Sequence, residues 1–140
     1  MNNYNDYKEH AVKTYDVYMA MSVLSWDQET KMPKNGSKFR AQQLSTLAKI
    51  AYDLSTNKQY GQLLEQLNND NSLNSDQKRN VYLSRKEYLK NNKYSSEFIV
   101  RQSKLISKAF NDWRIAKEQN NFTLFQESLE MLVELRREEC

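Results

Sequence analysis

Apolar side chains recur three and four residues apart along most of the chain, the spacing that places them on one face of an α-helix. The first such stretch predicts a helix from about Tyr4 to Asp27, roughly 35 Å long at 1.5 Å per residue. Its apolar positions are Tyr4, Tyr7, Ala11, Tyr15 and Tyr18, widened by Val12, Met19, Val23 and Trp26.

A loop should follow at residues 30–36, which hold the only proline and one of the two glycines. Ser37 is expected to cap a second helix that ends near Ser55. Thr56 is expected to cap a short third helix, which the polar run at residues 68–72 closes.

The same period predicts three more helices in the second half of the chain. One opens at Ser75 and runs to about Asn92. A long one begins at residue 95 or 96, has Trp113 on its buried stripe, and is broken at residues 120–121. The last runs from about Phe122, and because its end carries no glycine or other stop signal, we expect the chain to be cut within or just after it.

Composition supports an all-α protein of about six helices in an elongated antiparallel bundle, with residues 1–140 as a single domain. Hydrophobic residues make up 39% and charged residues 28%, and two glycines and one proline leave few turns. No window approaches the roughly 18 apolar residues that a membrane span needs. The polar amino terminus lacks the pattern of a secretory signal, so a cytoplasmic protein without a membrane partner is expected.

No residue of this chain is assigned a catalytic, metal-binding or cofactor-binding role. A hydrolytic zinc site needs three protein ligands, and His10 is the only histidine. A histidine in this position is expected at the surface or at the edge of the core. Cys140 is the last residue and the only cysteine, which makes a tuned nucleophile improbable there.

One stretch carries a family signature. It reads Leu24-Ser25-Trp26-Asp27-Gln28-Glu29-Thr30-Lys31-Met32-Pro33, followed by Arg40-Ala41-Gln42-Gln43-Leu44-Ser45-Thr46-Leu47. Together with Trp113-Arg114, Asn121-Phe122 and the run Leu132 to Glu138, it resembles the amino-terminal region of the carboxypeptidase Taq family, the thermostable metallocarboxypeptidases 1. The resemblance extends over nearly the whole chain in family order.

The resemblance implies the amino-terminal part of a larger helical metallopeptidase fold. Such an enzyme removes carboxy-terminal amino acids from peptides with zinc or a similar divalent ion, and its metal-binding His-Glu-x-x-His lies beyond the point where this chain stops. This chain is therefore expected to be inactive alone. Its implied partners are the remainder of the parent enzyme, the peptide substrate in the full-length protein only, and a second copy in a homodimer.

The signature residues allow two interpretations. Trp26, Asp27, Gln28, Glu29 and Thr30, followed by Met32 and Pro33, could line the substrate groove of the full-length enzyme. Alternatively Trp26 fills the core, while the polar residues satisfy backbone groups where the helix ends. The structural interpretation is favoured. Arg40 could pair with Asp27 or Glu29 in either case.

The distribution of charge along the chain supports the main alternative function. Residues 76–117 hold eleven Lys or Arg against four Asp or Glu. A stand-alone basic helical module that binds an acidic protein or nucleic acid is the alternative function, although nucleic acid is disfavoured because Tyr82 and Tyr88 occupy apolar stripe positions. If the chain belongs to a longer enzyme, apolar residues of its first and last helices should instead be exposed and drive self-association. The residues meant are Tyr15, Met19, Leu132 and Leu135.

Overall fold

The computed structural model describes residues 3–139, and within that range it contains helices and no strand. The elements in order are α1 (Asn3–Thr30), the short 3₁₀ helix η1 (Lys34–Gly36), α2 (Ser37–Ser55), α3 (Lys58–Asn68), α4 (Ser75–Asn91), α5 (Ser96–Glu118) and α6 (Thr123–Glu139). The prediction of an all-α protein with six α-helices is confirmed.

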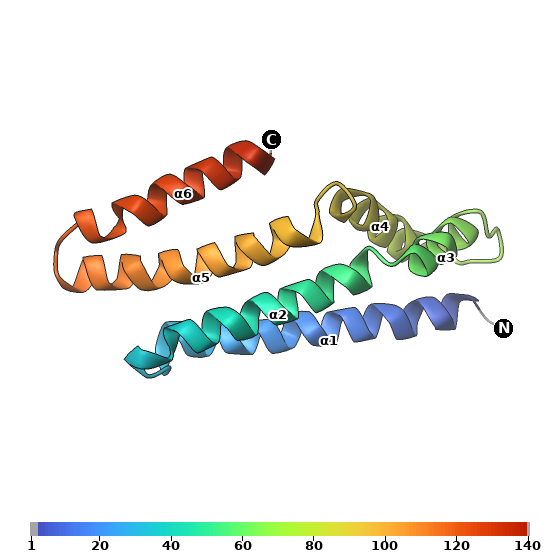
Figure 1. Ribbon diagram of the computed structural model, residues 1–140. Helices are drawn as coiled ribbons and strands as arrows, with labels where there is room; N and C mark the ends of the chain where they lie inside the picture. The colour runs from blue at the N-terminus through green and yellow to red at the C-terminus, as the bar shows by residue number, and fades with distance from the viewer. Residues whose placement is uncertain (1–2, 140) are drawn as a thin grey trace.

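The helices form an elongated antiparallel arrangement (Figure 1). α1 packs on α2 and α3, α2 packs on α5, and α5 packs on α6, while α3 and α4 form a hairpin at one end. No helix of the described part is long and apolar enough to cross a membrane. Because α1 packs mainly on α2 and α3, and α6 on α5, much of the circumference of these two helices faces solvent.

The buried residues lie in three regions, one of which is the contact of α6 with α5, where Ser128 and Leu135 are buried. Where the start of α1 meets α3 and α4, a cluster forms from Tyr7, Leu64, Leu67, Leu73 and Val81. Between α2 and α5 the buried residues are mostly small, including Ala48, Ala51 and Ala109, which lets these two helices approach closely.

Several helix ends differ from the sequence prediction by a residue or more. α1 continues to Thr30, three residues beyond the predicted end. Ser37 is the first residue of α2 rather than its cap. Thr56 is the C-cap of α2, and Asn57 caps α3 instead, because its side chain accepts the Tyr60 N–H. Asparagine and threonine are both good caps, so periodicity alone could not choose between neighbours.

The predicted break after α5 is confirmed. Asn120 has a φ of 49°, the left-handed conformation that asparagine tolerates better than most residues. The Asn121 N–H donates to the carbonyl of Ala116 at 2.9 Å, which closes the helix and turns the chain into α6. α5 and α6 therefore lie antiparallel.

The expectation that Trp113 is buried is wrong. Its side chain is 42% exposed, and Lys117 Nζ lies 5.0 Å from its ring centroid. The buried face of α5 is carried by Ala109 and Ala116, one heptad apart, so Trp113 lies at the edge of that face.

The predicted exposure of apolar residues is confirmed for α1 and wrong in part for α6. Tyr15 and Met19 are exposed. Leu135 is buried instead, because it lies on the α6 face that packs against α5, and Leu132 is half-buried.

Candidate functional site

The signature residues meet where α1 ends and α2 begins. Arg40, near the start of α2, points back to α1 with its side chain only 13% exposed. It donates from Nη2 to Asp27 Oδ2 at 2.7 Å and from Nη1 to the carbonyl of Leu24 at 2.5 Å. Its Nε donates to Gln43 Oε1 at 3.1 Å. The guanidinium thus uses its fork to bridge the two helices, and the predicted pairing with Asp27 is confirmed.

Gln28 extends this junction to a third helix. The Ser107 hydroxyl of α5 donates to Gln28 Oε1 at 2.8 Å. Ser107 is buried, so the bond ties the end of α1 to the middle of α5. Nothing in the spacing of the sequence pointed to Ser107, because it is 79 residues away.

The remaining polar residues of the motif shape the turn. Thr30 Oγ1 donates to the carbonyl of Trp26 at 2.7 Å, which satisfies a backbone group at the helix end as the structural interpretation expected. The N–H groups of Lys31 and Met32 both donate to the carbonyl of Asp27. Pro33 precedes η1, and Met32 packs against Gly36 closely enough that an added Cβ there would lie 3.2 Å from Met32 Cγ.

Trp26 does not fill the core, so that part of the structural interpretation is wrong. Its side chain is 61% exposed, and Glu29 and Pro33 beside it are exposed too. Phe39, one residue before Arg40, is exposed as well. The junction therefore presents aromatic side chains to solvent on a framework that Arg40 and Gln28 hold in place.

His10 has a structural role in this arrangement. Its Nε2 lies 2.9 Å from the carbonyl oxygen of Leu54, and its ring stacks on Tyr60 with centroids 4.1 Å apart. The structure thus places it at the edge of the core, as expected. Among residues 3–139 no three His, Cys, Asp or Glu side chains are grouped to hold a metal ion, and Cys140 lies outside the described residues.

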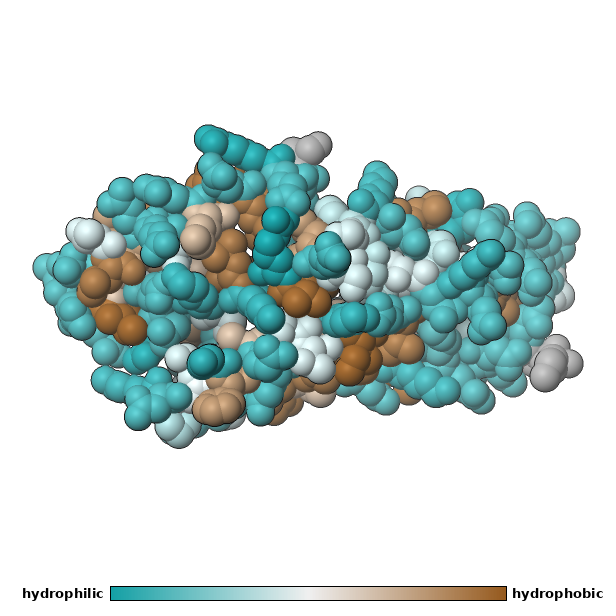
Figure 2. All heavy atoms as spheres, in the orientation of Figure 1, coloured by the Kyte–Doolittle hydropathy of each residue, from teal (hydrophilic) through white to brown (hydrophobic). Residues whose placement is uncertain are grey.

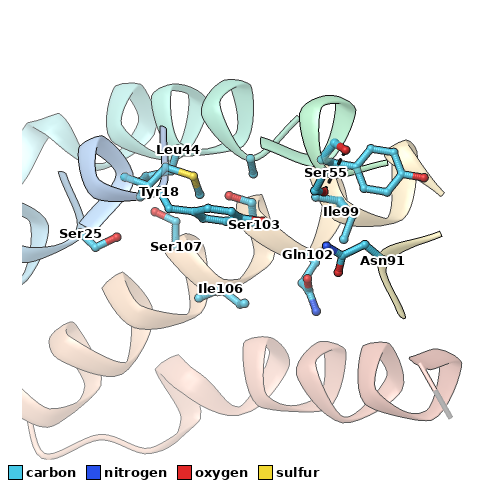
Figure 3. A pocket seen from close by; sticks show the side chains of 13 residues that line it. Tyr18, Ser25, Leu44, Ser55, Asn91, Ile99, Gln102, Ser103, Ile106 and Ser107 are labelled. Atoms are coloured by element: carbon cyan, nitrogen blue, oxygen red, sulfur yellow. Dashed lines mark hydrogen bonds between the residues drawn. The ribbon is translucent and has the colours of Figure 1, made fainter. Parts of the chain in front are cut away.

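Beside this junction, a groove opens between α1 and α5, and α2 forms its floor (Figure 3). Its volume is about 330 Å³, and none of its thirteen lining residues is charged. Tyr18 enters it from α1, Leu44 and Ala48 form the floor, and Ile106 comes from α5. Burial raises the pKa of the Tyr18 hydroxyl, and the nearby charge of Glu87 raises it further.

A polar network joins α5 to α6 on the other side of the molecule. Asp112 Oδ2 accepts from Lys108 Nζ at 2.7 Å and from the buried Ser128 hydroxyl at 2.5 Å. Partial burial by itself raises the pKa of Asp112, but the hydrogen bonds from Lys108 and Ser128 outweigh it, and the pKa is lowered.

The basic residues of α4 are distributed on its solvent side. Arg85 pairs with Glu65 of α3 at 2.7 Å, and Arg79 lies over the Tyr82 ring at 5.4 Å. Lys86 and Lys90 are exposed beside Leu89. This face is an amphipathic basic surface with an open hollow of about 510 Å³, lined by Leu83, Lys86, Glu87, Leu89, Lys90 and Lys93.

The chain is similar to known peptidases over almost its whole length. The family model described as carboxypeptidase Taq (M32) metallopeptidase matches residues 6–140. Carboxypeptidase 1 of Bacillus subtilis (strain 168) is 33% identical over 119 residues, which are 84% of this chain and 24% of that protein. The solved structure of BsuCP has a TM-score of 0.94 at 28% identity, covering 99% of this chain. The M32 carboxypeptidase from Deinococcus radiodurans R1 has a TM-score of 0.75 at 26% identity over the same 99%. This chain spans 28% of each of those two structures.

Proposed function

Because the chain belongs to the carboxypeptidase Taq (M32) metallopeptidase family, we propose that residues 1–140 form the amino-terminal helical domain of a metallocarboxypeptidase that removes carboxy-terminal amino acids from peptides. One observation carries this proposal: the family model matches residues 6–140 of a chain that spans only about a quarter of its relatives' length. The domain supplies scaffold and surface, and the rest of the enzyme supplies the chemistry.

The residues present do not suit the zinc, or similar divalent ion, of the proposed parent enzyme. The His10 ring is stacked on Tyr60 with Nε2 beside a carbonyl oxygen, and no ligand group of three accompanies it among residues 3–139. A hydrolytic metal needs about three protein ligands and an open position for water. We therefore propose that ligands outside these residues hold the metal.

The signature junction is proposed to position one wall of the peptide groove. Asp27, Arg40 and Gln28 fix the end of α1, the start of α2 and the middle of α5 relative to one another, with bonds of 2.7–2.8 Å. Glu29 and Pro33 stand exposed on that framework, available to a peptide in the full-length protein. Asp27, Arg40 and Gln28 are therefore positioning residues, and the exposed residues are candidate contacts for the peptide.

The proposed enzyme is cytoplasmic and homodimeric. Support for self-association is the exposure of large apolar side chains on α6, including Met131 and Val133. Figure 2 shows hydrophobic residues reaching the surface over the α1, α2, α5 and α6 part of this face, while the α3–α4 end is mostly hydrophilic. The rival function, a basic module for an acidic protein or nucleic acid, would use the α4 surface instead.

A chimera tests the proposal. Residues 6–140 replace the matching region of Bacillus subtilis carboxypeptidase 1, and release of carboxy-terminal amino acids from a peptide is followed with and without chelator. We expect chelator-sensitive release by the chimera and none by the isolated chain. An inactive, well-folded chimera would count against the proposal, and salt-dependent RNA or DNA binding by the isolated chain would favour the rival.

A further inference from the structure

The central part of α1 is uncharged on all sides, yet it has neighbours on only one side. Residues 17–26 are ten consecutive residues without an Asp, Glu, Lys or Arg, in a chain that is 28% charged. None of these ten, all within the described range, is fully buried, and Tyr18, Met19, Val23 and Trp26 are exposed. A helix that is apolar all round is typical of an internal helix. α1 therefore has the sequence of a helix surrounded by others.

The groove between α1 and α5 is a place for one missing neighbour. It continues into a second hollow, which shares Tyr18, Ser55 and Asn91 with it. Along α1 the two hollows extend from Ala11 to Ser25, about 21 Å at 1.5 Å per residue. That length corresponds to roughly four turns of helix.

The chemistry of the lining favours a helix over an extended peptide. An extended segment needs hydrogen-bond partners for the N–H and C=O of each residue, whereas a helix satisfies its own. The groove is mainly apolar, and its free polar side chains are few. Within residues 3–139 the side chains of Ser25, Gln102 and Ser103 make no hydrogen bond and remain available to polar side chains of an occupant.

We propose that this groove and the uncharged α1 residues 17–25 receive an amphipathic helix from the part of the enzyme outside these 140 residues, so that this part of α1 becomes internal. The inference rests on the proposed function, since the occupant belongs to the same metallocarboxypeptidase. Two observations identify the occupant. The matched relatives have about three quarters of their length outside the aligned region. The groove lining holds no charged residue and its continuation holds one, Glu87, a depletion of charge that is typical of the centre of protein interfaces.

Cysteine accessibility tests the proposal in the chimera described above. Single cysteines replace Ile106 in the groove, Val23 on α1, and Leu89 on α4, in a background where every other cysteine, including Cys140, is serine. Ile106 and Leu89 are matched, with exposed fractions of 49% and 46%, so Leu89→Cys is the control. The rate of maleimide labelling is measured in the isolated 140-residue chain and in the chimera.

We expect Ile106→Cys and Leu89→Cys to label at similar rates in the isolated chain. In the chimera, Ile106→Cys and Val23→Cys should label at least about tenfold more slowly, with Leu89→Cys unchanged. Fast labelling at all three positions would overturn the proposal. So would protection of Leu89→Cys alone, which indicates a partner on the basic α4 surface. Protection of Ile106→Cys that already occurs in the isolated chain and is lost on dilution would assign the groove to a second copy.

Peptidase activity of the same chimera is a separate readout. An active chimera with an open groove would retain the proposed function and reject the helix in the groove. An inactive chimera with a protected groove would do the reverse. A groove that becomes protected only when peptide substrate is added would make it a substrate site and overturn the proposal.

Discussion

Replacing Arg40 by alanine tests whether the α1–α2 junction stabilises the fold. The substitution removes the hydrogen bonds to Asp27 and to the Leu24 carbonyl, made by a side chain that is only 13% exposed. Hydrogen bonds that involve a charged group contribute about 1.5–3 kcal/mol when their partner is left unsatisfied. Since Asp27 is one-third exposed and water can reach it, we expect Arg40→Ala to lower the free energy of unfolding by about 2 kcal/mol.

Thermal unfolding followed by circular dichroism measures this loss. For a chain of this size, 2 kcal/mol corresponds to a fall in Tm of about 6–10 °C. Arg85→Ala is the control, because its pair with Glu65 has exposed fractions of 36% and 51% and should contribute about 0–1 kcal/mol. Arg40→Lys keeps the charge but loses the fork, and should fall between the parent and Arg40→Ala.

A double-mutant cycle with Asp27→Ala separates the ion pair from the bond to the backbone. We expect a coupling free energy of about 1 kcal/mol between the two positions. If Arg40→Ala melted within 1–2 °C of the parent, or no lower than Arg85→Ala, the junction would not be a stabilising element, and the argument from burial and bond geometry would be refuted.

Four further outcomes are expected. Trp113→Ala should cost about 1–2 kcal/mol rather than the 3–5 of a fully buried aromatic, because the side chain is 42% exposed; chemical denaturation that showed a larger loss would contradict the position described. Gly61→Ala should destabilise by about 1–2 kcal/mol despite better helix propensity, since the new Cβ would lie 2.3 Å from Tyr88 Cζ, and the loss should disappear in a Tyr88→Ala background. The lowered pKa of Asp112 means that its stabilising effect is fully present above the unfolded pKa of about 3.9 and is lost as pH falls through the folded value, so Tm should drop less below pH 4 in Asp112→Asn than in the parent. Finally, the purified chain should bind no stoichiometric zinc by elemental analysis, and a metal content near one per chain would disprove this.

Much of the secondary structure follows from local signals in the sequence. The helical period marks α2 and α5 within a residue or two, and the asparagines at 120–121 end α5 where expected. The position of a helix cap did not follow from the sequence in the same way, because Thr56 and Asn57 are neighbours and both residue types are favoured as N-caps. These signals act over a few residues, so they survive without knowledge of the fold.

The candidate site was predictable only in part. The signature from Trp26 to Pro33 and Arg40 are close enough in sequence for their pairing to be anticipated, and Arg40 does bind Asp27. The bond from Ser107 to Gln28 spans 79 residues, and no periodicity encodes such a partner. The groove was missed for the same reason, although the uncharged run at residues 17–26 was a readable sign of an unusual helix.

The sequence by itself determined that the chain is helical, where its helices begin and end to within a few residues, and which family signature it carries. Tertiary structure alone decided which apolar residues are buried. Leu135 lies on the α6 face that packs on α5 and is covered, whereas Trp26 and Trp113 stay exposed. The physical reason is that periodicity records which residues share a face of a helix, while burial depends on whether another part of the chain packs on that face.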